Sequence, residues 1–295
     1  MINKVGSVCH KWNYRRRRCA EEISVYRMGG TEAYHFVSKL AVDADGSPKA
    51  YHRLDRNPRD NSAKAYDWLA NISVSDLHGI QGRNGARGPE QGYYISGTSL
   101  FDRRYPESDT RRWVDAAKIP YIVAPLKLFP ADNGLKLKKG CICFVADTKT
   151  GYSTGAIFAD VGRAVGEGSL ALGLRMGLKP FYSRSRPKVA GIGGKRFFYL
   201  LFPKTHLDPP WPLDELQRIA MKEFENWGGE ARLRAIIPNF PTLRAPVEDP
   251  EFDFEKNTLE SINEDDEFEL ESMTLDYGRK GLDVSKRELE FGDVE

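Results

Sequence analysis

Short apolar runs, each bounded by glycine, proline or acidic residues, recur along the middle of this chain. They lie at 33–46, 92–102, 119–125, 140–147, 153–162 and 195–203, and they are rich in β-branched and aromatic side chains. Such a series predicts the strands of a mainly β domain rather than alternating strands and helices. The segment ADTKTGYST (146–154) predicts a hairpin connection. We expect a barrel-like domain with a few decorating helices, and a double-psi barrel as its topology.

Helical periodicity is visible in three segments. The clearest is 210–229, in which Pro212 suits the first turn and Gly228 ends the helix. Its apolar face consists of Leu213, Leu216, Ala220 and Phe224. Shorter helices are predicted at 63–73 and 168–178. We expect the helix near 212–227 to pack against the strands.

Charge is divided unevenly along the chain, although the net charge is only +2. Residues 247–295 carry 18 acidic and 5 basic side chains, so residues 1–246 carry a surplus of 15 positive charges. We predict a basic N-terminal lead at 1–30, the main domain at 31–245 and an acidic extension at 246–295. The extension is expected to be solvated or partly disordered. The alternative is that it contacts the basic body or a delivery partner.

The sequence predicts no membrane association. No stretch approaches the roughly 20 apolar residues that span a bilayer, and residues 1–19 lack the apolar core of a secretory signal. Three locations fit these observations: export without a visible signal peptide, an extracellular form whose leader was trimmed, and the cytoplasm.

The four cysteines do not form a predicted metal site. Cys9 and Cys19, with His10 between them, lack the paired spacing of a zinc site, but a Cys9–Cys19 disulfide stays open. Cys141 and Cys143 lie on one face of a predicted strand, and we expect them to be core residues.

Three further motifs lack the context that their ligands need. GIGGK (191–195) has no Ser or Thr after the lysine and precedes a strand, which argues against a phosphate loop. DADG (43–46) is not followed by the remaining ligands of a calcium loop. The arginine run at 15–18 comes without a recognised nucleic-acid module. We expect no metal, no organic cofactor and no nucleic-acid partner.

Two carboxylates, Asp160 and Glu167, stand seven residues apart and next to glycines. Asp160 lies at the end of an apolar strand, and an extended chain would place Glu167 about 23 Å away. A turn through Gly162 and Gly166 could bring the carboxyl groups to the separations that glycosidases use, about 5 to 5.5 Å for retention and about 6.5 to 9.5 Å for inversion. The alternative is turn chemistry for Asp160 and a helix N-terminal position for Glu167.

Five motifs follow one another between about residues 36 and 204. They are VDADGSPKAYH (42–52), YDWLAN (66–71), GYYISGTSL (92–100), VDAAKIPYIVAP (114–125) and FADVGRAVGEGSLAL (158–172). Together they resemble the fungal-type chitosanases of glycoside hydrolase family 75. The resemblance implies endo-hydrolysis of β-1,4-linked glucosamine chains, with inversion and without a metal or organic cofactor.

The resemblance also implies roles for the carboxylate pair. Asp160 and Glu167 match the essential carboxylates of the family, with Glu167 as general acid and Asp160 as the base that activates water. Swapped roles stay open. A helix beginning beside Glu167 would lower its pKa, so an acid role requires burial or the charge of Asp160 to raise it.

The matching motifs hold further acidic and aromatic side chains. Asp43, Asp45, Tyr51, Tyr93 and Asp115 are candidates for a groove that binds the sugar chain, because carboxylates suit cationic amines and tyrosine rings suit sugar faces. Turn chemistry and core packing are the alternatives for each. The expected partner is an amino-sugar polysaccharide.

Two other functions stay open. Residues 31–204 carry 27 basic and 16 acidic side chains, a charge that would repel a polycation at long range. The substrate could instead be a more acetylated or anionic polymer such as peptidoglycan, cleaved by an enzyme delivered as an effector. A carbohydrate-binding protein without catalysis is the alternative from a different class.

Overall fold

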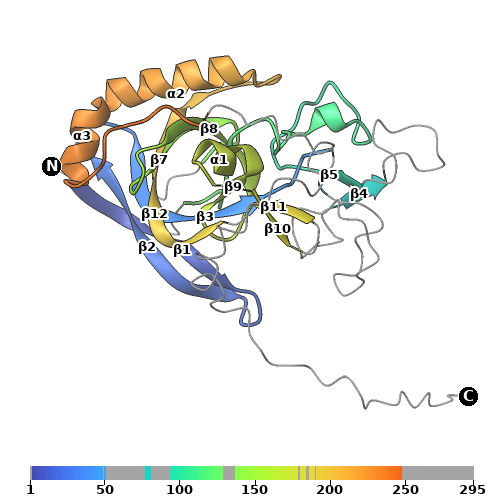
Figure 1. Ribbon diagram of the computed structural model, residues 1–295, viewed down its shortest axis with the longest axis horizontal. Coiled ribbons are helices and arrows are strands. Elements are labelled where there is room, and N and C mark those ends of the chain that lie inside the picture. The colour runs from blue at the N-terminus through green and yellow to red at the C-terminus, as the bar shows by residue number, and fades with distance from the viewer. Residues whose placement is uncertain are drawn as a thin grey trace, which may run out of the picture. The chain divides into compact units, whose positions relative to one another are not determined.

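The computed structural model describes residues 2–48, 50, 77–80, 94–128, 137–178, 180–183, 186–189 and 191–247 (Figure 1). The strands are β1 (Ile2–Asn13), β2 (Arg18–Met28), β3 (Tyr34–Asp43), β4 (Leu77–Ile80), β5 (Tyr94–Ser96), β6 (Tyr121–Ala124), β7 (Cys141–Asp147), β8 (Ser153–Val161), β9 (Glu167–Ser169), β10 (Pro180–Ser183), β11 (Arg186–Val189) and β12 (Ile192–His206). The helices are the 3-10 helix η4 (Thr110–Arg112), α1 (Leu170–Arg175), α2 (Leu213–Trp227) and α3 (Gly229–Ile236). The chain divides into two units, and all the described residues lie in the first, residues 1–250.

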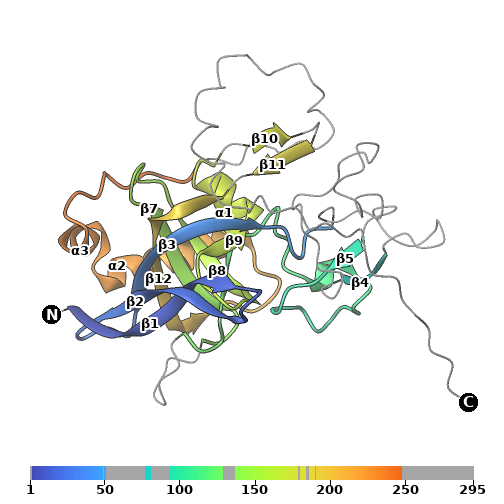
Figure 2. The same cartoon turned by 90° about the horizontal axis from the view of Figure 1, so that it is seen from below.

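Six strands close into a barrel within the first unit (Figures 1 and 2). β3, β12, β7, β8, β6 and β9 are hydrogen-bonded in this order, and β9 pairs with β3 to complete the circle. The β3–β9 and β6–β8 pairs are parallel, and the other pairs around the barrel are antiparallel. The prediction of a mainly β, barrel-like domain is confirmed, whereas the double-psi topology stays a prediction.

The basic lead is a long antiparallel hairpin. β1 pairs with β2, and β2 pairs with β3, so the hairpin extends the barrel sheet at one side. The arginine run 15–18 lies at the exposed turn of this hairpin. Cys9 and Cys19 form a disulfide, with their Cα atoms 5.6 Å apart. The bond that the sequence left open is therefore present.

Helix α2 covers β7 and β8 on the outside of the barrel (Figure 1). Leu216, Ala220 and Phe224 are fully buried there, and the Phe224 ring stacks on Phe144 with centroids 4.0 Å apart. A side chain on Gly155 would collide with Ala220, so this glycine permits the close approach of helix and strand. The predicted packing helix is confirmed, and the buried cysteines of β7, Cys141 and Cys143, are core residues as expected.

The hairpin connection predicted between β7 and β8 is also confirmed. Asp147 at its start is fully buried and accepts two hydrogen bonds from the Arg196 guanidinium, at 2.7 and 2.6 Å. Burial alone would raise the pKa of Asp147, but Arg196 and the hydroxyl of Thr150 hold it below its usual value. The Asp147 carboxylate is therefore ionised although it is buried. The positive charge of Arg196 compensates the free-energy cost of burying this negative charge.

The short helix predicted at 168–178 is α1, and the Ser169 hydroxyl caps it by accepting the Leu172 N–H at 3.1 Å. The helix predicted at 63–73 and residues 248–295 of the acidic extension lie outside the described residues. Within the described part of the chain, no helix has the length and apolar character needed to cross a bilayer.

Candidate active site

Two strands on either side of β6 carry Asp160 and Glu167. Asp160 of β8 pairs with Val123 of β6, and Glu167 of β9 pairs with the same Val123 from the opposite side. Neighbouring strands lie about 4.8 Å apart, so the two main-chain positions are separated by about 9 to 10 Å instead of about 23 Å. The reversal of the chain that the two carboxylates require is therefore present.

The turn 162–166 makes this reversal and depends on its glycines. Gly166 has a φ of 87°, and a side chain there would collide with the Ser38 hydroxyl and the Lys39 main chain. A left-handed backbone in such a crowded place is tolerated by glycine alone. Gly162 lies very close to β6: a Cβ atom added to Gly162 would lie 2.7 Å from Val123 Cγ1.

Two further aspartates lie beside Asp160. Asp43 ends β3 and Asp45 follows in the next turn, and one carboxylate oxygen from each of Asp43, Asp45 and Asp160 lies within 4.8 Å of the others. The charges of Asp45 and Asp160 also act on Glu167. We call Asp43, Asp45, Asp160 and Glu167 the carboxylate cluster. Four of the seven residues that the sequence singled out thus come together.

The surroundings of Glu167 favour its neutral form. Burial raises the pKa of this carboxyl to about 7; the Lys39 ammonium opposes the rise, and the charges of Asp45 and Asp160 add to it. The nearby start of α1 does not outweigh these effects. Part of the residue's surface stays open to solvent. Below about pH 7, Glu167 therefore holds a proton within reach of a ligand.

Asp160 is held by Ser99, a residue that the sequence did not single out. Asp160 Oδ1 accepts hydrogen bonds from the Ser99 N–H at 2.8 Å and from the Ser99 hydroxyl at 2.6 Å. The hydroxyl oxygen in turn accepts the Val161 N–H at 3.2 Å. Two donors on one oxygen suit an ionised carboxylate. Ser99 lies within the motif GYYISGTSL, yet no spacing rule distinguishes a serine in a loop.

Asp43 and Asp45 differ in exposure. Asp43 is buried, and burial raises its pKa, with the charges of Asp45, Glu167 and Asp160 raising it further. The Asp45 N–H donates to Asp43 Oδ1 at 2.9 Å, and the Ser96 hydroxyl donates to Asp45 Oδ1 at 2.8 Å. Asp45 is only half-buried. Asp45 is therefore the aspartate of this pair that a ligand can reach more readily.

Asp115, Tyr51 and Tyr93 are the remaining predicted residues. Asp115 caps the turn before β6, where its Oδ1 atom accepts the Ala117 N–H at 2.9 Å and its carboxylate lies 3.7 Å from Lys118. Burial raises the pKa of Asp115. These contacts are of the kind that the sequence left as the alternative, and a place for Asp115 in the sugar groove stays a prediction. Tyr51 and Tyr93 lie outside the described residues.

The carboxylate cluster has oxygen ligands of the kind that Ca²⁺ and Mg²⁺ prefer. Asp43, Asp45 and Asp160 could each offer one oxygen to such an ion. The Ser96 hydroxyl donates to Asp45 and the Ser99 hydroxyl donates to Asp160, so one oxygen of each of these carboxylates already accepts a hydrogen bond. The expectation of no metal stays a prediction.

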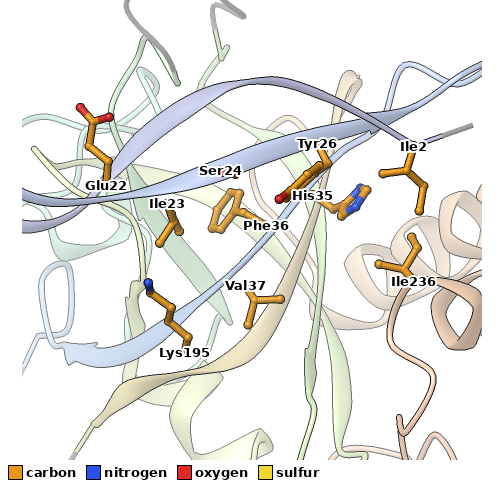
Figure 3. A pocket seen from close by; sticks show the side chains of 10 residues that line it. All are labelled: Ile2, Glu22, Ile23, Ser24, Tyr26, His35, Phe36, Val37, Lys195 and Ile236. Atoms are coloured by element: carbon orange, nitrogen blue, oxygen red, sulfur yellow. The ribbon is translucent and has the colours of Figure 1, made fainter.

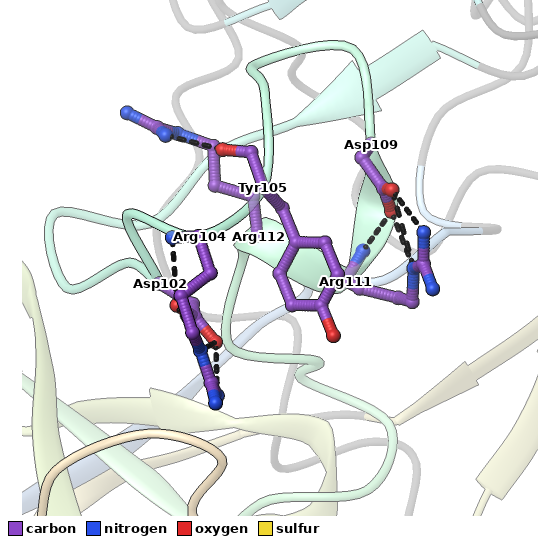
Figure 4. Close-up of polar contacts among 6 residues, drawn as sticks. All are labelled: Asp102, Arg104, Tyr105, Asp109, Arg111 and Arg112. Atoms are coloured by element: carbon purple, nitrogen blue, oxygen red, sulfur yellow. Dashed lines mark hydrogen bonds and ion pairs between the residues drawn. The ribbon is translucent and has the colours of Figure 1, made fainter.

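Arginine–aspartate pairs brace the loop that joins Ser99 to Asp115 (Figure 4). The pairs are Asp102 with Arg104 and Asp109 with Arg111, at 2.7 and 2.6 Å. The Arg112 guanidinium donates to the Tyr105 carbonyl at 2.6 Å. At the start of the loop, the Leu100 N–H bonds to the Ala159 carbonyl of β8 at 2.7 Å. The Leu100–Ala159 hydrogen bond therefore holds the residue next to Ser99 against β8.

One cavity that the described residues line has none of the four cluster residues in its wall. This cavity of about 530 Å³ lies beside β2 and β3, where His35, Phe36 and Ile236 are among the lining residues (Figure 3). His35 is buried, and burial lowers its pKa to about 4. The chemistry of the candidate site therefore rests on the cluster itself and not on this cavity.

Comparison of the chain with models of known protein families and with curated proteins found no match.

Proposed function

We propose that this protein is an endo-acting glycoside hydrolase that cleaves β-1,4-linked glucosamine polymers such as chitosan. Glu167 acts as the general acid and Asp160 as the general base. The observation that carries the proposal is the pairing of both residues with Val123 from opposite sides of β6, with unlike surroundings for the two carboxyl groups. The resemblance in five motifs supports the same assignment.

The two carboxyl groups differ in the way that this chemistry needs. With a pKa of about 7, Glu167 can protonate the leaving glycosidic oxygen in weakly acidic solution. Asp160, with two donors from Ser99, can take a proton from the water whose oxygen attacks the sugar carbon. Main-chain positions about 9 to 10 Å apart allow the two side chains to face one bond. Inversion, which needs about 6.5 to 9.5 Å between the carboxyl groups so that water fits, is what the resemblance implies.

The acidic surroundings support a cationic substrate. Asp45 and Asp160 lie together at the cluster, and carboxylates attract the protonated amines of glucosamine at short range. The positive surplus of residues 31–204 acts over longer distances. At physiological salt, interactions between exposed charges are largely screened beyond about 8 Å, so the carboxylates nearest the sugar decide the local preference.

A second candidate is a peptidoglycan-cleaving enzyme delivered as an effector. The four arginines at the exposed turn of the hairpin and the basic surplus favour an anionic polymer. Both candidates place the protein outside the cytoplasm, and the Cys9–Cys19 disulfide supports an oxidising location for either.

The test is release of reducing ends from chitosan, chitin and peptidoglycan by the wild type, Asp160→Asn and Glu167→Gln. Glu225→Gln is the matched control, because Glu225 is an exposed carboxylate on α2. We expect wild type and control to cleave chitosan, and both cluster variants to lose about a hundredfold or more of kcat while retaining the fold. Proton NMR of the first products would then report inversion at the anomeric carbon.

Other outcomes would redirect the assignment. Cleavage of peptidoglycan alone would support the effector, and binding of a polymer without turnover would support the non-catalytic protein. Full activity of Asp160→Asn and Glu167→Gln would refute the two-carboxylate mechanism.

A further inference from the structure

We propose that the disulfide-linked hairpin β1–β2 positions the Asp160 and Glu167 pair by holding the turn 162–166. The catalytic meaning of this inference rests on the proposed hydrolase function. The contacts that carry it are independent of that function, and they come from three residues of β1, namely Cys9, His10 and Trp12.

The first contact is a main-chain hydrogen bond. The Val165 N–H, near the end of the turn, donates to the Cys9 carbonyl of β1 at 2.9 Å. Val165 is only 1% exposed, so water has little access to replace this acceptor. Removing the acceptor would leave a buried N–H unpaired, which makes the bond costly to break.

The second contact passes through His10. Cys9 pairs with Glu22 and Lys11 pairs with Glu21, so His10 is the extra residue of a bulge in β1. His10 is buried, and its Nδ1 atom is hydrogen-bonded to the Ser38 hydroxyl at 2.8 Å. The same hydroxyl lies against Gly166, where a side chain would collide with it. His10 and Ser38 therefore shape the place into which Gly166 fits.

The third contact is between an arginine of the turn and an aromatic ring of β1. The Arg163 guanidinium carbon lies 5.2 Å from the centroid of the Trp12 ring, within cation–π distance. Trp12 pairs with Cys19 across the hairpin. Cys19, which is bonded to Cys9, is therefore also the cross-strand neighbour of Trp12, whose ring contacts Arg163.

Together these contacts tie three of the five turn residues to Cys9, His10 and Trp12. The disulfide joins Cys9 to β2 at the point where two irregularities interrupt the β1–β2 ladder. The covalent bond therefore restrains the part of β1 whose main-chain pairing is irregular. The hairpin consequently restrains the turn 162–166, which sets the spacing of Asp160 and Glu167.

The direct test is amide hydrogen exchange of Val165 in the full chain. Opening the hairpin with Cys9→Ser together with Cys19→Ser should speed this exchange about tenfold, as expected for weakening one or two hydrogen bonds. Trp12→Ala should also speed the exchange of the Val165 amide. Trp12→Phe keeps an aromatic ring and should retain most of the protection. Arg16→Ala, at the exposed hairpin turn, is the control. Unchanged Val165 exchange in both the cysteine-free hairpin and Trp12→Ala would overturn the proposal.

Kinetics distinguish positioning from a general loss of stability. In the variants with faster exchange, kcat should fall about fivefold with KM changed less than about twofold, because the carboxylates lose alignment rather than sugar contacts. The alkaline limb of the pH profile should move to lower pH, because a looser turn admits water around Glu167. An unchanged kcat and pH profile would overturn the positioning role. If the wild type cleaves none of the polymers, the hydrolase proposal fails, while the exchange result still decides whether the hairpin holds the turn.

Discussion

Replacing Glu167 by glutamine removes a titrating carboxyl while keeping the size and polarity of the side chain. In the folded protein the pKa of Glu167 is about 7, against an ordinary value of 4.5 in an unfolded chain. As pH rises from 4.5 to 7, the unfolded chain ionises this group but the folded protein does not. The free energy of unfolding of the wild type therefore falls across that window and stays lower above it.

The size of this effect follows from the two pKa values. One pKa unit corresponds to about 1.4 kcal/mol, so the difference between folded and unfolded states amounts to at most about 3 kcal/mol above pH 7. The glutamine variant does not titrate and escapes this loss. We expect Glu167→Gln to match the wild type near pH 4.5 and to exceed its free energy of unfolding by up to about 3 kcal/mol at pH 8.

Urea unfolding, followed by tryptophan fluorescence at pH 5 and pH 8, measures this difference. Glu225→Gln, which removes an exposed carboxylate from α2, should show no comparable change between the two pH values. The reasoning would be refuted if Glu167→Gln gained the same stability at both pH values or lost stability at pH 8. Either result would mean that the Glu167 carboxyl is well solvated and cannot hold a proton near neutral pH.

Four further outcomes test the site and the fold. A pH profile of chitosan hydrolysis should show kcat falling above about pH 7, as Glu167 loses the proton that it donates. Ser99→Ala removes the hydroxyl donor to Asp160 and should lower kcat about tenfold with KM changed less than about twofold; a change in KM alone would assign Ser99 to substrate binding. Dialysis against EDTA should leave the rate of hydrolysis unchanged, and a loss that added Ca²⁺ restores would contradict the acid–base assignment. Arg196→Leu leaves the buried Asp147 carboxylate without its partner and should lower the free energy of unfolding at pH 7 by about 3 kcal/mol in urea; a loss below about 1 kcal/mol would show that the pair matters little.

The elements that could be predicted from the sequence are those whose signal is local. Apolar runs bounded by turn residues marked the barrel strands β6, β7, β8 and β12, and one apolar face marked α2. The closing strand β9 has three residues, too few for any periodicity. The hairpin β1–β2 could not be predicted, because its many charged side chains are typical of a solvated segment. Alternate residues near its disulfide are nevertheless buried.

Some residues of the candidate site could likewise be predicted from local patterns in the sequence, and others could not. Asp160 and Glu167 were suggested by their spacing and their glycines, and Asp43 and Asp45 by the motifs around them. Ser99 reaches Asp160 across 61 residues of sequence, and no local pattern reports a contact of that kind. The tertiary contact between β8 and the loop that follows β5 decides this part of the site, and tertiary contacts likewise decide the partners of the turn 162–166.

The brevity of β9 sets a limit on how the chain can change in evolution or in design. Glu167 is paired on one side with β3 and on the other with β6, so its main chain cannot slide without opening the barrel. Adding or deleting a single residue between 160 and 167 would shift this strand by one step and turn the glutamate to its opposite face. The connection between Asp160 and Glu167 must therefore keep its number of residues for Glu167 to face the same way.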